Sequence, residues 1–117
     1  MEVNGKLANE AMDFAVEIVR LSDILSEQKD YNISNQICRS GTSIGANISE
    51  ANYAASRADF INKLRIALKE ANETLYWLEL AVRAERINSA TYETYSKKCS
   101  SIRAMLVKSI KTAEKNS

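Results

Sequence analysis

The sequence predicts an all-α protein: an up-down-up-down antiparallel four-helix bundle that forms a single domain over residues 1–117. Proline is absent and glycine occurs only three times, so the two residue types that most disfavour helix interiors are nearly missing. Apolar residues recur at intervals of three and four in four segments separated by short polar breaks. Four such segments bury their apolar stripes most economically by packing as an antiparallel bundle.

Residues 4–27 form the first predicted helix, which carries charged side chains on a face away from its apolar stripe. That stripe consists of Leu7, Ala11, Phe14, Ile18, Leu21 and Leu25. The polar stretch SEQKDYN separates this helix from a second one, whose stripe consists of Ile33, Ile37, Ser40, Ile44 and Ile48. Gly41 and Gly45 share one side of the second helix.

The third predicted helix begins at Ser56, whose hydroxyl can cap the first turn while Asp59 completes a pattern like a capping box. Its stripe consists of Phe60, Leu64, Ala67, Ala71, Leu75, Leu78 and Val82. The stretch RINSAT ends this helix, and Asn88 or Ser89 can cap the fourth. The stripe of the fourth helix consists of Tyr95, Cys99, Ile102, Leu106 and Ala113.

Composition argues against an enzyme. Histidine is absent, which removes the commonest acid-base residue near neutral pH and the Glu-x-x-His pairs of a di-iron bundle. Cys38 and Cys99 are far apart without metal-ligand spacing, and we interpret them as small buried hydrophobic residues rather than reactive thiols. We expect no cofactor, no metal and no membrane contact, because no apolar run approaches the roughly 20 residues that span a bilayer. Without a signal sequence, a cytoplasmic location is expected.

The charge is unevenly distributed along the chain. Residues 1–50 carry four basic and eight acidic side chains, whereas residues 51–117 carry twelve basic and seven acidic ones. An asymmetry of this kind can hold the two halves of the fold together, attract another copy of the chain, or present a basic face to a polyanion. The charge count leaves these three alternatives open.

A row of polar residues runs along the second predicted helix beside its isoleucine stripe. Arg39, Ser43, Asn47 and Glu50 are four, four and three residues apart, so they share one side of a helix. This polar ridge is either a solvated face or a buried or half-buried link to another element. Serine, asparagine and glycine disfavour helix interiors by up to about 1 kcal/mol relative to alanine, which favours a specific role.

The same residues resemble a known family, the four-helix-bundle proteins named for 23S rRNA intervening sequences. The resemblance spans essentially the whole chain. The matching positions are Gln36, Ile37, Arg39, Ser43, Ile44, Asn47, Ile48, Glu50, Phe60, Leu64, Ile66, Ala67 and Glu73. It implies a four-helix protomer assembled as a ring-like pentamer. Related accessory variability-determinant proteins of diversity-generating retroelements bind nucleic acid and a reverse transcriptase, so the resemblance also implies such partners.

Three positions depart from the family pattern. Gly45 stands where proline is common, Ala51 where glycine is common, and Glu70 where serine is common. Because of the first two, the kink of the second helix and the way the chain leaves it can differ from those of the family. For the polar ridge we hypothesise a link from the second helix to the third helix or to a neighbouring subunit, with Glu73 as the partner.

The third predicted helix carries a second apolar strip made of Ile66, Trp77 and Leu80, away from its main stripe. One interpretation is an interface between copies of the chain, because exposed aromatic and aliphatic patches often mark interfaces. The other is a wide core-facing surface that includes Trp77. We favour the interface.

Basic residues concentrate on the last predicted helix. They are Lys97, Lys98, Arg103, Lys108, Lys111 and Lys115. In a ring this face would be repeated and would form a polyvalent surface for RNA or DNA phosphates, although lysine is also the usual residue on a solvated helix face. The leading prediction is a non-enzymatic, oligomeric adaptor that binds nucleic acid electrostatically. The alternative is a protein-interaction scaffold that does not bind nucleic acid.

Overall fold

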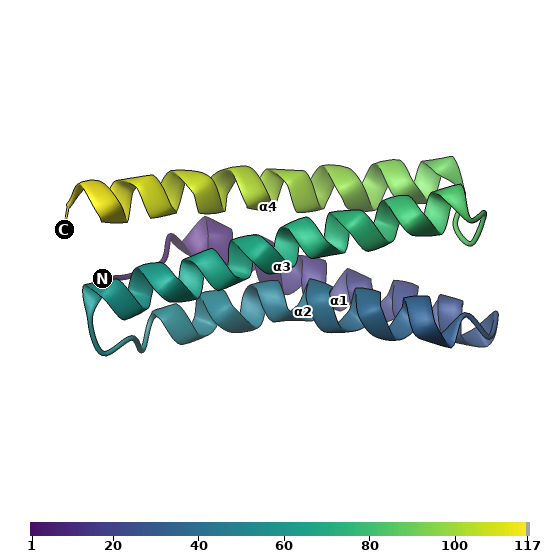
Figure 1. Ribbon diagram of the computed structural model, residues 1–117, viewed down its shortest axis with the longest axis horizontal. Coiled ribbons are helices and arrows are strands. Elements are labelled where there is room, and N and C mark those ends of the chain that lie inside the picture. Colours follow the sequence, from purple (N-terminus) through teal and green to yellow (C-terminus); the bar gives the residue numbers. More distant parts are fainter. Residues whose placement is uncertain (117) are drawn as a thin grey trace.

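The computed structural model describes residues 1–116, which form four helices and no strand: α1 (Gly5–Glu27), α2 (Tyr31–Ala51), α3 (Arg57–Arg83) and α4 (Ser89–Lys115). Figure 1 shows the helices running back and forth along one axis, with the α1–α2 and α3–α4 loops at one end and the α2–α3 loop at the other. The bundle measures 46 × 20 × 19 Å, and its long dimension is close to the length of α3 and α4. The predicted all-α four-helix fold is confirmed.

Three helices begin at a side chain that caps their free amides. Asn4 accepts hydrogen bonds from the amides of Lys6 and Leu7, and Ser56 accepts one from Asp59. Asn88, rather than Ser89, caps α4 by accepting from the amide of Thr91 at 2.8 Å. Asp30 precedes α2 without making a side-chain cap bond. The carboxylate of Asp30 instead pairs with Arg86 at 2.8 Å and so joins the two loops at that end of the bundle.

Both loops at this end use a residue other than glycine in the left-handed backbone region. Lys29 has φ 66° and Glu85 has φ 61°. The amide of Asp30 then donates to the carbonyl of Leu25 at 2.9 Å, and the amide of Arg86 donates to that of Ala81 at 2.8 Å. Each is the hydrogen bond of a Schellman motif that links a residue to the one five positions earlier. The carbonyls of the last helical turns are satisfied in this way although neither loop contains glycine.

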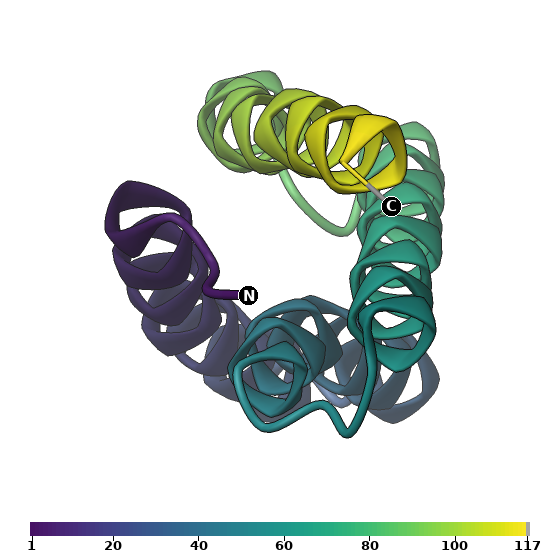
Figure 2. The ribbon, with the colours of Figure 1, turned by 90° about the vertical axis from the view of Figure 1, so that its left-hand side faces the viewer.

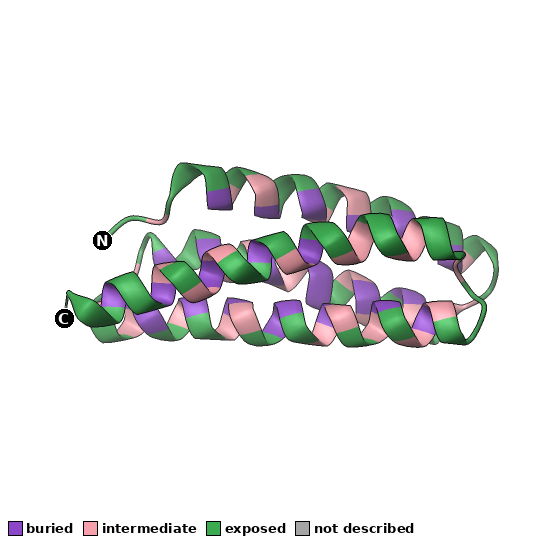
Figure 3. Cartoon of the chain, turned by 90° about the horizontal axis from the view of Figure 1, so that it is seen from above, coloured by how far each residue is buried: buried purple, intermediate pink, exposed green. Residues whose placement is uncertain are grey.

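The predicted stripes form the hydrophobic core. Figure 3 shows buried residues on the sides of the helices that face one another and exposed residues on the outside. All predicted stripe residues of α1 are buried. Four predicted stripe residues of the other helices are half-buried rather than buried: Ile33, Leu75, Val82 and Tyr95. Helix α2 is continuous through Gly45 and ends at Ala51, so the departures from the family pattern do not interrupt it.

The side of the bundle between α1 and α4 is the most open, as the end-on view in Figure 2 shows. Near the middle of α1 the two helices are joined, because the Tyr95 hydroxyl donates to the Glu17 carbonyl at 3.0 Å and Lys98 pairs with the Glu17 carboxylate at 2.7 Å. Toward the chain termini, a hollow lies between α1 and α4 in place of such contacts. None of the helices in residues 1–116 has an apolar stretch long enough to cross a membrane.

Candidate functional site

Arg39 links α2 to α3 through two carboxylates. Its Nη1 lies 3.1 Å from Oε2 of Glu70, and its Nη2 pairs with Glu73. The Arg39 side chain is 49% exposed, whereas that of Glu70 is only 11% exposed. Glu73 is the partner that the sequence suggested, and Glu70 is a second one, more deeply buried. Both carboxylates are held in ion pairs, an arrangement that suits helix-to-helix attachment.

The other residues of the polar ridge do not cross to α3 in the same way. The Ser43 hydroxyl donates to the carbonyl of Arg39 at 2.6 Å, and the Asn47 amide donates to the carbonyl of Ser43 at 2.9 Å. Both side chains are half-buried and bond within α2. Glu50 is exposed and pairs with Lys63 of α3 at 3.4 Å. The ridge therefore divides into two ion-pair links to α3 and two local hydrogen bonds.

Buried hydroxyls make two helix-to-helix contacts that sequence reasoning missed. Thr74 of α3 donates to Ser40 of α2 at 2.9 Å, and both residues are fully enclosed. Ser34 of α2 donates to the Ser22 carbonyl of α1 at 2.8 Å, and the Ser22 hydroxyl donates to the Ser34 carbonyl at 3.1 Å. The available signal was a hydroxyl residue at a core position in facing helices, because buried hydroxyls need partners. In the sequence pattern Ser40 stands out only as a member of the stripe.

Ile66, Trp77 and Leu80 are all half-buried on α3. Trp77 packs against the hydrophobic core and makes an edge contact with the Tyr76 ring at a centroid distance of 5.2 Å. Its indole N–H is buried and has no acceptor among residues 1–116. Trp77 thus belongs in part to the core-facing surface, while Tyr76 beside it is 60% exposed.

The six basic residues of α4 fall into two groups. In the half nearer Asn88, Lys98 is paired with Glu17, and Arg103 donates to the Asn72 side chain at 3.3 Å. Lys97 is exposed in the same half. In the half near the chain end, Lys108, Lys111 and Lys115 are exposed and make no ion pair within residues 1–116. The basic character of α4 is therefore best available to a ligand near its end.

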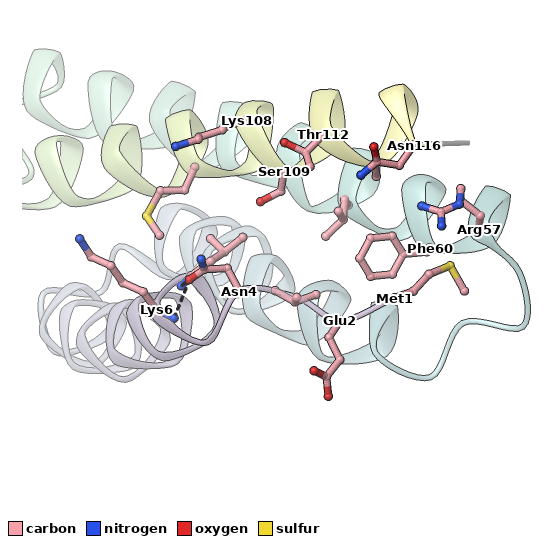
Figure 4. A pocket seen from close by; sticks show the side chains of 15 residues that line it. Met1, Glu2, Asn4, Lys6, Arg57, Phe60, Lys108, Ser109, Thr112 and Asn116 are labelled. Carbon is pink, nitrogen blue, oxygen red and sulfur yellow. Dashed lines mark hydrogen bonds between the residues drawn. The ribbon is translucent and has the colours of Figure 1, made fainter.

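A hollow of about 700 Å³ adjoins this end of α4, between α4 and the starts of α1 and α3. Figure 4 shows Lys6 of α1, Arg57 of α3 and Lys108 of α4 around it. Its apolar part is lined by Leu7, Phe60, Leu64, Met105 and Ala113. Among residues 1–116 Glu2 is the one acidic side chain that lines it, so positive side-chain charge from three helices predominates there. Sequence reasoning missed Lys6 and Arg57, because only folding brings them to the same hollow as Lys108.

The two cysteines differ in their surroundings. Cys99 is completely buried and donates to the Ala71 carbonyl at 3.4 Å, whereas Cys38 is half-buried. Burial raises the pKa of the Cys99 thiol to about 12. Burial and, to a smaller extent, the Glu17 carboxylate also raise the pKa of Tyr95. A thiol that stays protonated is a poor nucleophile, so Cys99 acts as a small core residue.

This shift predicts a loss of stability at alkaline pH. Folded Cys99 retains its proton up to about pH 12, whereas an unfolded cysteine loses it near pH 8.5, so the folded state binds more protons between these values. Its contribution is complete below about pH 8.5 and declines as the pH rises, by at most about 1.4 kcal/mol per pH unit. Urea unfolding from pH 7.5 to 10.5 should show a steeper decline in the wild type than in Cys99→Ala. Parallel curves would contradict the assignment.

Among residues 1–116 no group of histidine, cysteine, aspartate and glutamate side chains is arranged to hold a metal ion. The features that the structure presents are instead polar helix-to-helix links, exposed apolar side chains and the basic hollow at one end of the bundle.

Comparison with known proteins agrees with the fold and the motif. The 23S rRNA-intervening sequence protein family matches residues 4–108. A crystal structure from Bacteroides thetaiotaomicron VPI-5482, described as a protein with unknown function from the S23 ribosomal protein family, is 55% identical, with a TM-score of 0.88. That similarity covers 90% of this chain and 98% of the other. Among curated proteins none matches. The chain belongs to the 23S rRNA-intervening sequence protein family.

Proposed function

We propose that this protein is a non-enzymatic adaptor of the cytoplasm that assembles with copies of itself and binds nucleic acid through phosphate contacts. The observation that carries the proposal is the collection of cations from three helices at one end of the bundle, around the hollow in Figure 4. Lys6, Arg57 and Lys108 make no ion pair within residues 1–116, and Lys111 and Lys115 extend the same basic surface along α4.

Assembly would strengthen a surface of this kind. The family resemblance supports a ring of five, in which each copy contributes its basic end. Several weak sites on one ring raise the effective concentration of phosphates at the next site, so the assembly binds more tightly than a single copy. Such binding is largely independent of base sequence and weakens steeply with salt, because each phosphate contact releases counterions. Both the family and the related crystal structure carry names that refer to the ribosome, which makes RNA the first nucleic acid to test.

The test is fluorescence anisotropy of labelled single- and double-stranded RNA and DNA, titrated with protein at low and near-physiological salt. Binding is expected at low salt, with an affinity that falls at least tenfold as the salt rises. Lys108→Glu should weaken binding several-fold, because it reverses a charge inside the basic hollow. Lys29→Glu is the matched control, since it makes the same change of charge in the α1–α2 loop at the opposite end of the bundle.

Equal weakening by Lys108→Glu and Lys29→Glu would mean that net charge matters and the basic end does not. An absence of binding even at low salt would reject nucleic-acid binding and favour the protein-interaction scaffold. The search would then turn to protein partners, of which a reverse transcriptase is the one that the resemblance supports.

A further inference from the structure

Helix α1 carries an apolar stripe on the side that faces away from the core. Met12, Val16 and Val19 follow one another at intervals of four and three, so they form a single row. They are 64%, 44% and 44% exposed, whereas Phe14 and Ile18 between them are buried on the opposite face. A solvated helix normally presents polar residues there, and a row of exposed apolar side chains indicates a surface that another protein covers.

A second exposed apolar surface lies on α3. Tyr76 is 60% exposed, Leu80 is half-buried, and these two residues border a shallow hollow of about 440 Å³ together with Glu79, Arg83 and Ala84. Such a hollow next to an aromatic side chain can receive the side chains of an apolar row. Helices α1 and α3 both lie next to α2 and on different sides of it, so the two surfaces face in different directions (Figure 2).

The α3 surface begins at about the height along the bundle where the α1 row ends. An added Cβ on Gly41 would lie 2.8 Å from Ile18, and the neighbouring Ser40 is hydrogen-bonded to Thr74. These contacts place the middle of α1 level with the part of α3 that precedes Tyr76.

Charge distinguishes between the ways in which these surfaces can pair. Helix α1 is acidic: exposed Asp13, Asp23 and Glu27 flank the apolar row without an ion pair among residues 1–116, and they outnumber the basic Arg20 beside them. Near Tyr76 the exposed face of α3 carries Lys69, which makes no ion pair among residues 1–116, and Arg83, which is paired with exposed Glu79 at 2.9 Å. Two α1 rows placed together would repel, whereas an α1 row facing α3 brings its acidic side chains toward Lys69.

From these observations we infer that the α1 row of Met12, Val16 and Val19 in one copy docks onto the Tyr76 and Leu80 surface of α3 in a second copy of this chain. The inference rests on the self-association in the proposed function and specifies its two surfaces. Each copy uses both surfaces once, so the contact repeats from copy to copy, as the ring of the proposed function requires.

The test is cross-linking of cysteine variants built in a Cys38→Ser background, in which the remaining native thiol, Cys99, is buried. Val16→Cys and Tyr76→Cys proteins are mixed, allowed to exchange subunits and treated with a short bifunctional maleimide. A cross-linked dimer is expected in the mixture and not in either protein alone. A chain carrying both substitutions should give a ladder of bands that stops at the number of copies in the ring. In the control, the Tyr76→Cys protein is mixed with Ala104→Cys, which places the thiol on the exposed face of α4. This mixture should give no cross-linked dimer.

Light scattering of the wild type separates the possible failures. A monomer at micromolar concentration would overturn both the inference and the self-association on which it rests. An oligomer whose Val16→Cys variant cross-links only to itself, or to nothing, would overturn the inference and leave self-association in place. In an independent arm, Val16→Arg should weaken association at least tenfold with an unchanged helical circular dichroism spectrum, and Ala104→Arg should not. Equal effects of these two substitutions would also overturn the inference.

Discussion

Replacing Arg39 with alanine is expected to lower the free energy of unfolding by about 2–4 kcal/mol. The substitution leaves the Glu70 carboxylate, only 11% exposed, without the guanidinium that neutralises it, and Glu73 loses the same partner. An unpaired charge in a buried position is costly because it has given up water without receiving another partner. Because Arg39 is itself 49% exposed, water can partly replace it, so the expected loss extends below the 3–5 kcal/mol typical of a fully buried pair.

Lys63→Ala is the matched control for Arg39→Ala, since Lys63 pairs with exposed Glu50 across the same two helices at 3.4 Å. Its loss should be at most about 1 kcal/mol, the usual value of an exposed ion pair. Urea unfolding monitored by circular dichroism measures both variants. The double variant Arg39→Ala/Glu70→Ala should lose less stability than the two single variants together, because removing both partners removes the unpaired charge. Equal losses for Arg39→Ala and Lys63→Ala would show that Glu70 does not depend on Arg39.

The course of the helices could be predicted because their signals are local. The apolar rows at helical spacing and the capping side chains Ser56 and Asn88 depend on residues only a few positions apart. The two Schellman loops lack this advantage, because Lys29 and Glu85 occupy a backbone position that usually signals itself by glycine. The sequence shows a polar break at each place but does not identify the residue at which the chain turns.

The polar ridge shows where local reasoning ends. Helical spacing places Arg39, Ser43 and Asn47 on one side of α2, and side-chain length decides which of them reaches α3. The long arginine bridges to two carboxylates, whereas the short serine and asparagine bond to carbonyls of their own helix. The hollow around Lys6, Arg57 and Lys108 was beyond sequence reasoning for another reason, since its charges come from three distant helices.

The exposed row on α1 could have been found from the sequence. Helical spacing identifies the row that faces the core, and the same spacing on the opposite face joins Met12, Val16 and Val19. A single exposed apolar residue needs no explanation, but three in register on one face do. Searching for a second apolar row on each amphipathic helix is therefore a way to locate assembly surfaces before a structure is known.

Substituting alanine for each of the two glycines of α2 should have opposite effects on stability. Alanine favours a helix interior over glycine by about 1 kcal/mol, and this gain is available at both positions. At Gly41 the added Cβ would lie 2.8 Å from both Cγ1 and Cγ2 of Ile18, atoms attached directly to the branched carbon and unable to move without the rest of the side chain. At Gly45 its nearest neighbour is the Ala11 carbonyl oxygen at 3.4 Å.

We therefore expect Gly41→Ala to lower the free energy of unfolding by about 1–2 kcal/mol and Gly45→Ala to leave it unchanged or raise it by up to about 1 kcal/mol. Urea unfolding of both variants gives the comparison, and Ile18→Ala supplies the mechanism. If the clash with Ile18 causes the loss, Gly41→Ala should cost less in the Ile18→Ala protein than in the wild type, because both clashing atoms are then absent. An equal cost in the two backgrounds would place the strain elsewhere. The close approach of α1 to α2 at Ile18 would then not be the reason for glycine at position 41.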